Sequence, residues 1–89
     1  MTSNPMTMTF GASSPVFRTA DLSLTAVISV LGFGIEQIER VSPSRSVFIF
    51  EDSASLQETV SLYWRGDLRI EPRAYFDELK RIKARLYQR

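Results

Sequence analysis

The first helical pattern of apolar residues lies between Thr19 and Leu31. Its apolar face follows i, i+3, i+4 and i+7 spacing and consists of Leu24, Val27, Ile28 and Leu31. Further apolar residues widen this face, which is typical of a helix at the centre of a fold. Thr19 or Asp21 is expected to cap the helix, because either side-chain oxygen can accept from a free N–H of the first turn. Gly32 follows the predicted end.

Two strand-like segments come next, joined by a Ser-Pro-Ser turn at 42–44. The first runs from Gly34 to Val41, and its irregular apolar spacing predicts a bulge. The second runs from Arg45 to Asp52 and contains four consecutive apolar residues, which indicates burial on both faces. Together the two segments predict an antiparallel hairpin.

A second helix is expected from about Ser53 to Gly66. Ser55 and Glu58 have the spacing of a capping box, and Asp52 is an alternative cap one turn earlier. Residues 67–70 then alternate polar and apolar, which favours a short third strand.

A third helix is predicted from Pro72 nearly to Arg89. Its apolar stripe consists of Tyr75, Leu79, Ile82 and Leu86, with Phe76 and Tyr87 beside it. The expected fold class is α+β: a single domain over 16–89, ordered helix–β-hairpin–helix–(short strand)–helix, with an antiparallel sheet of two or three strands packed on the helices. Residues 1–15 carry no charged side chain and no periodicity, so we expect a flexible tail there.

Composition excludes several kinds of chemistry. The 89 residues include no Cys and no His, which excludes disulfides, thiol nucleophiles, Cys/His zinc sites and Ser-His-Asp triads. The carboxylates match no metal-binding spacing. We therefore expect no metal, no cofactor, no small-molecule substrate and no enzyme activity. The sequence also shows no signal peptide and no membrane-spanning run, so a cytoplasmic protein without membrane contact is expected.

The distribution of basic residues suggests a nucleic-acid interface. The net charge is only +1, yet five of the eleven Lys and Arg residues lie in the last ten positions. The candidate phosphate-binding residues are Arg73, Lys80, Arg81, Lys83, Arg85 and Arg89. The alternative is a solvated face whose charges complement the negative end of the helix dipole.

A protein interface is the leading hypothesis from the sequence. A domain this small has a marginal core, and association with a second copy or another protein would bury more apolar surface. Trp64, Arg65 and Tyr87 are the candidate interface residues, since Trp, Tyr and Arg are typical interface anchors. Phe48 and Phe50 could stack bases, but a Phe-x-Phe pair on a central strand is more often part of the core.

Several of these positions resemble a known family pattern. It combines an aromatic residue, an apolar helix opened by Thr and Asp-Leu, a Phe-x-Phe-Glu-Asp strand end and a final helix that begins with Pro. The matching residues are Phe17, Thr19, Asp21-Leu22, Ala26, Gly32, Phe48, Phe50-Glu51-Asp52, Tyr63, Pro72, Tyr75, Leu79-Lys80 and Leu86-Tyr87. In these the chain resembles a family of short bacterial and phage domains of unknown function. The resemblance implies a compact α+β unit and a mobile-element context, and it implies no functional site.

Overall fold

The computed structural model describes residues 15–87; residues 1–14 of the expected flexible tail at 1–15 lie outside this part of the chain, as do Gln88 and Arg89. The elements are β1 (Val16–Thr19), α1 (Leu22–Val30), β2 (Ile35–Ser42), β3 (Arg45–Glu51), α2 (Ala54–Arg65) and α3 (Pro72–Tyr87). The α+β class, the hairpin and the three helices are confirmed.

The sheet has three antiparallel strands in the order β1-β3-β2, so the apolar strand β3 is central. Register shifts between Ile35 and Gln37 and between Arg40 and Ser42 confirm that the first hairpin strand is irregular. Phe48 and Phe50 on β3 are buried, at 2% and 0% exposure, which confirms them as core residues.

The third strand differs in position from the prediction. It is β1, in which Phe17 pairs with Phe50 and Thr19 with Phe48, whereas 67–70 contains no strand. Four residues are too few for alternation to mark β1 in the sequence. The alternation at 67–70 comes from packing, because Leu68 and Ile70 are half-buried in the link between α2 and α3.

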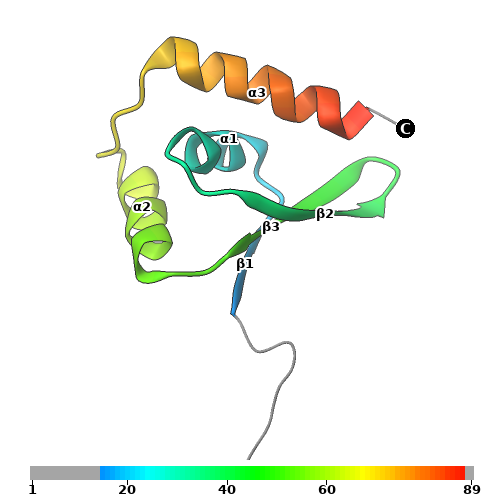
Figure 1. The fold of residues 1–89 in the computed structure, drawn as a ribbon, viewed down its shortest axis with the longest axis horizontal. Coiled ribbons are helices and arrows are strands. Elements are labelled where there is room, and N and C mark those ends of the chain that lie inside the picture. Colours follow the sequence, from blue (N-terminus) through cyan, green and yellow to red (C-terminus); the bar gives the residue numbers. More distant parts are fainter. Residues whose placement is uncertain (1–14, 88–89) are drawn as a thin grey trace, which may run out of the picture.

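The three helices lie on one side of the sheet, and α1 lies between α2 and α3 (Figure 1). The core contains residues from all three helices and from the central strand β3. It consists of Leu24, Ala26, Ile28, Phe48, Phe50, Leu56 and Ile82. The first helix is shorter than predicted: Asp21 caps it through a 3.0 Å hydrogen bond from the Leu24 N–H. Leu31 follows its last residue and is 43% exposed, so it does not belong to the buried face.

The second helix begins earlier than its predicted capping box. Ser53 is the N-cap and its Oγ accepts from the Leu56 N–H at 3.1 Å, so the pairing of Ser55 with Glu58 was wrong. Gly66 ends α2 in the left-handed conformation, at φ 77°. In residues 15–87 no helix is long and apolar enough to cross a membrane.

Candidate nucleic-acid interface

The inner face of α3 fixes the helix on the domain. Ile82 is buried, and Leu79 and Leu86 pack against the core. The Tyr75 hydroxyl lies 3.0 Å from the Ser23 Oγ of α1, which also accepts a 3.1 Å hydrogen bond from the Tyr63 hydroxyl of α2. A single serine thus links all three helices, and this linkage holds α3 in a defined orientation.

The opposite side of α3 combines basic residues and aromatic rings. At about 100° of rotation per residue, five side chains lie within roughly 80° of arc and point away from Ile82. We call this group the outer face; it consists of Arg73, Phe76, Lys80, Lys83 and Tyr87. All five are exposed, and the exposed fraction is 55% for Phe76 and 76% for Tyr87.

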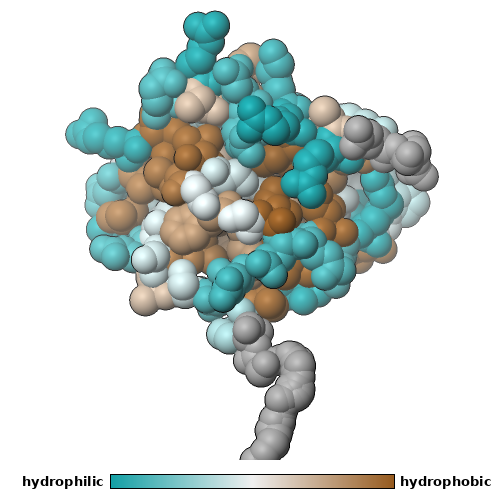
Figure 2. All heavy atoms as spheres, viewed as in Figure 1, coloured by the Kyte–Doolittle hydropathy of each residue, from teal (hydrophilic) through white to brown (hydrophobic). Residues whose placement is uncertain are grey.

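Cations and rings on the outer face are close to each other. The Lys80 ammonium lies 5.3 Å from the centroid of the Phe76 ring, within the range of a cation–π contact. Within residues 15–87, no ion pair engages Lys80, Lys83 or Arg73. Figure 2 shows hydrophilic atoms projecting along the upper edge of the molecule, where α3 runs, and hydrophobic atoms below them toward α2. The outer face therefore presents positive charge beside exposed rings, with the exposed carboxylate of Asp77 at its edge.

The helix divides five of the six basic residues predicted to bind phosphate; the sixth, Arg89, lies outside the described residues. Arg73, Lys80 and Lys83 share the outer face, whereas Arg81 and Arg85 lie on the other flank of α3 by the same rotation. Arg81 forms an ion pair with Glu78, three residues earlier. Phe76 and Tyr87 were expected beside the apolar stripe, but they belong to the outer face. A helical-wheel projection of the sequence alone would have placed both rings on the same face as Arg73, Lys80 and Lys83.

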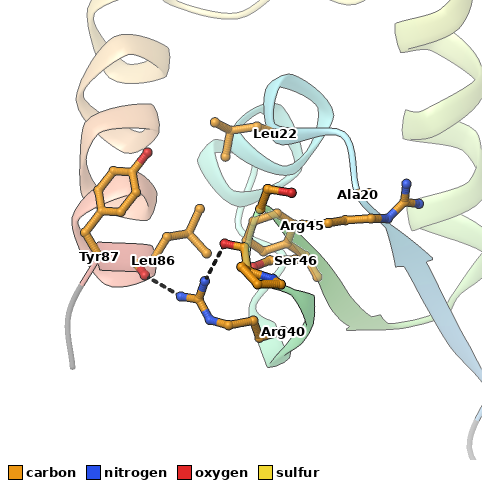
Figure 3. Close-up of a pocket in the computed structure, with 10 residues that line it drawn as sticks. Ala20, Leu22, Arg40, Arg45, Ser46, Leu86 and Tyr87 are labelled. Carbon is orange, nitrogen blue, oxygen red and sulfur yellow. Dashed lines mark hydrogen bonds between the residues drawn. The ribbon is translucent and has the colours of Figure 1, made fainter.

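The β2–β3 hairpin brings further basic residues to the end of α3. The Arg40 guanidinium donates a 2.8 Å hydrogen bond to the Leu86 carbonyl in the last turn of the helix. Arg40, Arg45 and Tyr87 line one pocket between the hairpin and α3 (Figure 3). Sequence reasoning did not find this pocket, because 46 positions separate Arg40 from Leu86.

The predicted protein-interface residues do not form one surface. Trp64 is 63% exposed at the end of α2, where its ring meets Tyr63 edge-on at 4.9 Å. Arg65 pairs with Asp67 at 3.2 Å. Tyr87 lies at the far end of α3, well away from the end of α2 (Figure 1). In residues 15–87, no group of three or more Asp, Glu, His or Cys residues is placed to hold a metal ion.

Comparison with known proteins places the chain in a family. No curated protein and no solved structure matches it. The model of a family described as a domain of unknown function, DUF5659, matches residues 15–88, which is most of the chain and includes every helix and strand described above. The resemblance to uncharacterised domains is therefore confirmed, and the chain belongs to the DUF5659 family.

Proposed function

We propose that this domain binds single-stranded nucleic acid through the outer face of α3. The observation that carries the proposal is the placement of two ammonium groups between two exposed rings along one helix face. Phe76, Lys80, Lys83 and Tyr87 follow each other at i, i+4, i+7 and i+11. The two cations can neutralise phosphates, and the rings on either side of them can stack bases.

The preference for single strands follows from the rings. Phe76 and Tyr87 are eleven positions apart, which is about 16 Å along the helix axis, so they reach different nucleotides. Bases in a duplex hide their faces in the stack, whereas an unpaired strand can turn its bases onto aromatic side chains. A duplex would use only the cations and would bind more weakly.

The test compares two double variants that differ in helix face and not in net charge. Lys80→Glu with Lys83→Glu reverses the outer face, and Arg81→Glu with Arg85→Glu reverses the other flank. Fluorescence anisotropy of labelled single-stranded DNA and RNA is measured for both variants and for the unmodified protein, with duplexes of the same sequence as competitors.

We expect the outer-face variant to lose about tenfold or more in affinity at low salt, because it removes two phosphate contacts. The flank variant should bind nearly as the unmodified protein does. For three phosphate contacts, the logarithm of the association constant should fall with the logarithm of salt at a slope of about −2. Absence of binding at low salt, or equal losses in both variants, would overturn the proposal.

A protein-interaction role is the second candidate, and exposed Trp64 favours it. The Trp64 ring meets Tyr63 edge-on at the end of α2, where two backbone hydrogen bonds close the helix: the Gly66 N–H donates to the Tyr63 carbonyl at 3.1 Å and the Asp67 N–H to the Leu62 carbonyl at 3.0 Å. An exposed Trp is typical of an interface anchor. On this hypothesis a second copy of the chain covers Trp64.

Trp64 is the chain's only tryptophan, so its fluorescence reports on this position alone. Self-association should shift the emission to shorter wavelength as protein concentration rises, and sedimentation should show a dimer that Trp64→Ala abolishes. A monomer with unchanged emission over the whole concentration range would contradict self-association.

A further inference from the structure

One pocket lies where the start of α1, the β2–β3 hairpin and the end of α3 meet. Its volume is about 510 Å³, which is within the range of small-molecule sites. Figure 3 shows the Leu86 side chain extending from α3 toward the hairpin, Leu22 above it on α1 and Arg40 below. These residues come from three segments that are distant in sequence, so the pocket is a product of the fold.

Arg40 provides a fixed positive charge at one side of the pocket. Its guanidinium donates to the Leu86 carbonyl at 2.8 Å and lies 3.5 Å from the Pro43 carbonyl, at the outer limit of a hydrogen bond. These two contacts use two of its five N–H donors. Neither acceptor carries a formal charge, so three donors remain available for an anion, while the Leu86 carbonyl belongs to the negative end of the α3 dipole and offsets part of the positive charge.

The other polar residues of the pocket also suit an anion. None of the ten lining residues is acidic. Ser44 and Ser46 contribute hydroxyl groups, whereas the Tyr87 hydroxyl extends along α3 away from Arg40 (Figure 3). Ser46 pairs with Arg40 across the hairpin. Arg45 lines the pocket, although Figure 3 shows its side chain extending away from Arg40; an exposed Arg changes rotamer within nanoseconds and can turn toward a bound anion.

The remaining lining is apolar. Leu22 and Leu86 flank the opening, and Ala20 and Phe48 also contribute to the wall. An inorganic anion would leave this part unused, whereas a flat, uncharged ring system would fill it. The ligand that matches both parts carries a phosphate at one end and an aromatic base at the other.

We propose that this pocket binds a nucleotide, with its phosphate on Arg40 and Arg45 and its base between Leu22 and Leu86. The ligand is a free mononucleotide or the phosphorylated end of a strand, since the same chemistry recognises both. The site shares Tyr87 with the outer face, but neither Lys80 nor Lys83 lines it, so its charges are independent of the outer-face proposal.

Calorimetric titration with adenosine monophosphate tests the site, with adenosine and inorganic phosphate as partial ligands. Adenosine monophosphate should bind more tightly than either. Arg40→Gln should weaken its binding about ten- to hundredfold, the loss that corresponds to one charge-assisted hydrogen bond. Arg45→Gln should weaken binding several-fold, while Arg69→Gln, the same charge change in the exposed link between α2 and α3, should leave it unchanged.

Arg40→Gln also removes the contact with Leu86, so thermal unfolding is measured for each variant. Arg45 forms no ion pair within residues 15–87, and Arg45→Gln keeps the proposal testable if Arg40→Gln unfolds. A short strand with a 5′-phosphate that binds more tightly than its unphosphorylated form would identify a strand end as the ligand.

Adenosine monophosphate binding that persists in the Lys80→Glu, Lys83→Glu variant would support the site even if strand binding failed. The proposal is overturned if adenosine monophosphate does not bind, if phosphate alone binds as tightly, or if Arg69→Gln weakens binding as much as Arg45→Gln does.

Discussion

The two faces of α3 contain similar residue types in different surroundings. Tyr75 is half-buried and hydrogen-bonded to Ser23, whereas Phe76, its neighbour in sequence, is 55% exposed. Ile82 is buried in the core, whereas Lys83 beside it is exposed and forms no ion pair with any residue that the structure describes. Position around the helix therefore separates residues that stabilise the domain from residues free to bind. Substitutions on the two faces should have separable effects.

The largest effect is expected on the inner face. Ile82→Ala should lower the free energy of unfolding by about 2–5 kcal/mol, because it leaves a cavity between α3 and the core. Chemical denaturation followed by circular dichroism measures this. A loss below about 1 kcal/mol would mean that α3 is not part of the core that supports its outer face.

Phe76→Ala tests the outer face. We expect it to weaken single-strand binding by about 1–3 kcal/mol, the contribution of one stacked base. Its effect on the free energy of unfolding should stay within about 0.5 kcal/mol, because the ring is exposed. An unchanged affinity, measured by anisotropy, would show that Phe76 does not stack a base and that binding rests on the charges alone.

Removing the hydroxyl group of Tyr75 or of Tyr87 gives a matched comparison of the two faces of α3. Tyr75→Phe should cost about 1 kcal/mol of stability, because it removes one of the two hydrogen bonds to Ser23. Tyr87→Phe should leave stability unchanged, since Tyr87 is 76% exposed. Equal changes in melting temperature for the two variants would contradict the difference between the faces.

The smallest effect is expected at the ion pair on the flank of α3. Arg81→Gln removes its contact with Glu78 and should lower stability by no more than about 0.5 kcal/mol, as exposed pairs spaced three residues apart usually do. It should not change single-strand affinity. A clear loss of affinity would extend the binding surface beyond the outer face.

Much of the fold could be predicted from local patterns. The four apolar residues of β3 identified the central strand, and the periodicity of α1 and α3 identified most of the residues that they bury, Leu31 excepted, because burial imposes a period on the sequence. Strand β1 was missed because its four residues gain their structure from pairing with β3 and not from their own pattern. The cap of α2 was misplaced by two residues, since Ser53 and Ser55 can both accept from a first-turn N–H.

The candidate interface was only partly predictable. The cluster of basic residues near the end of the chain was visible, and a helical-wheel projection already divides it between two faces of α3; the ion pair of Arg81 with Glu78 required the structure. Arg40 gave no signal at all, because its place beside Leu86 follows from how the hairpin packs on α3. Local patterns identify charged residues, and tertiary packing decides which of them share a surface.

The most direct test of the central claim is a nuclear magnetic resonance titration with a short single-stranded oligonucleotide. Amide signals of Phe76, Lys80, Lys83 and Tyr87 should shift progressively, while the indole N–H of Trp64, at the end of α2, should stay in place. Shifts confined to α2 or to the uncovered face of the sheet, or no shifts at high oligonucleotide concentration, would contradict the assignment of the outer face of α3 as the binding surface.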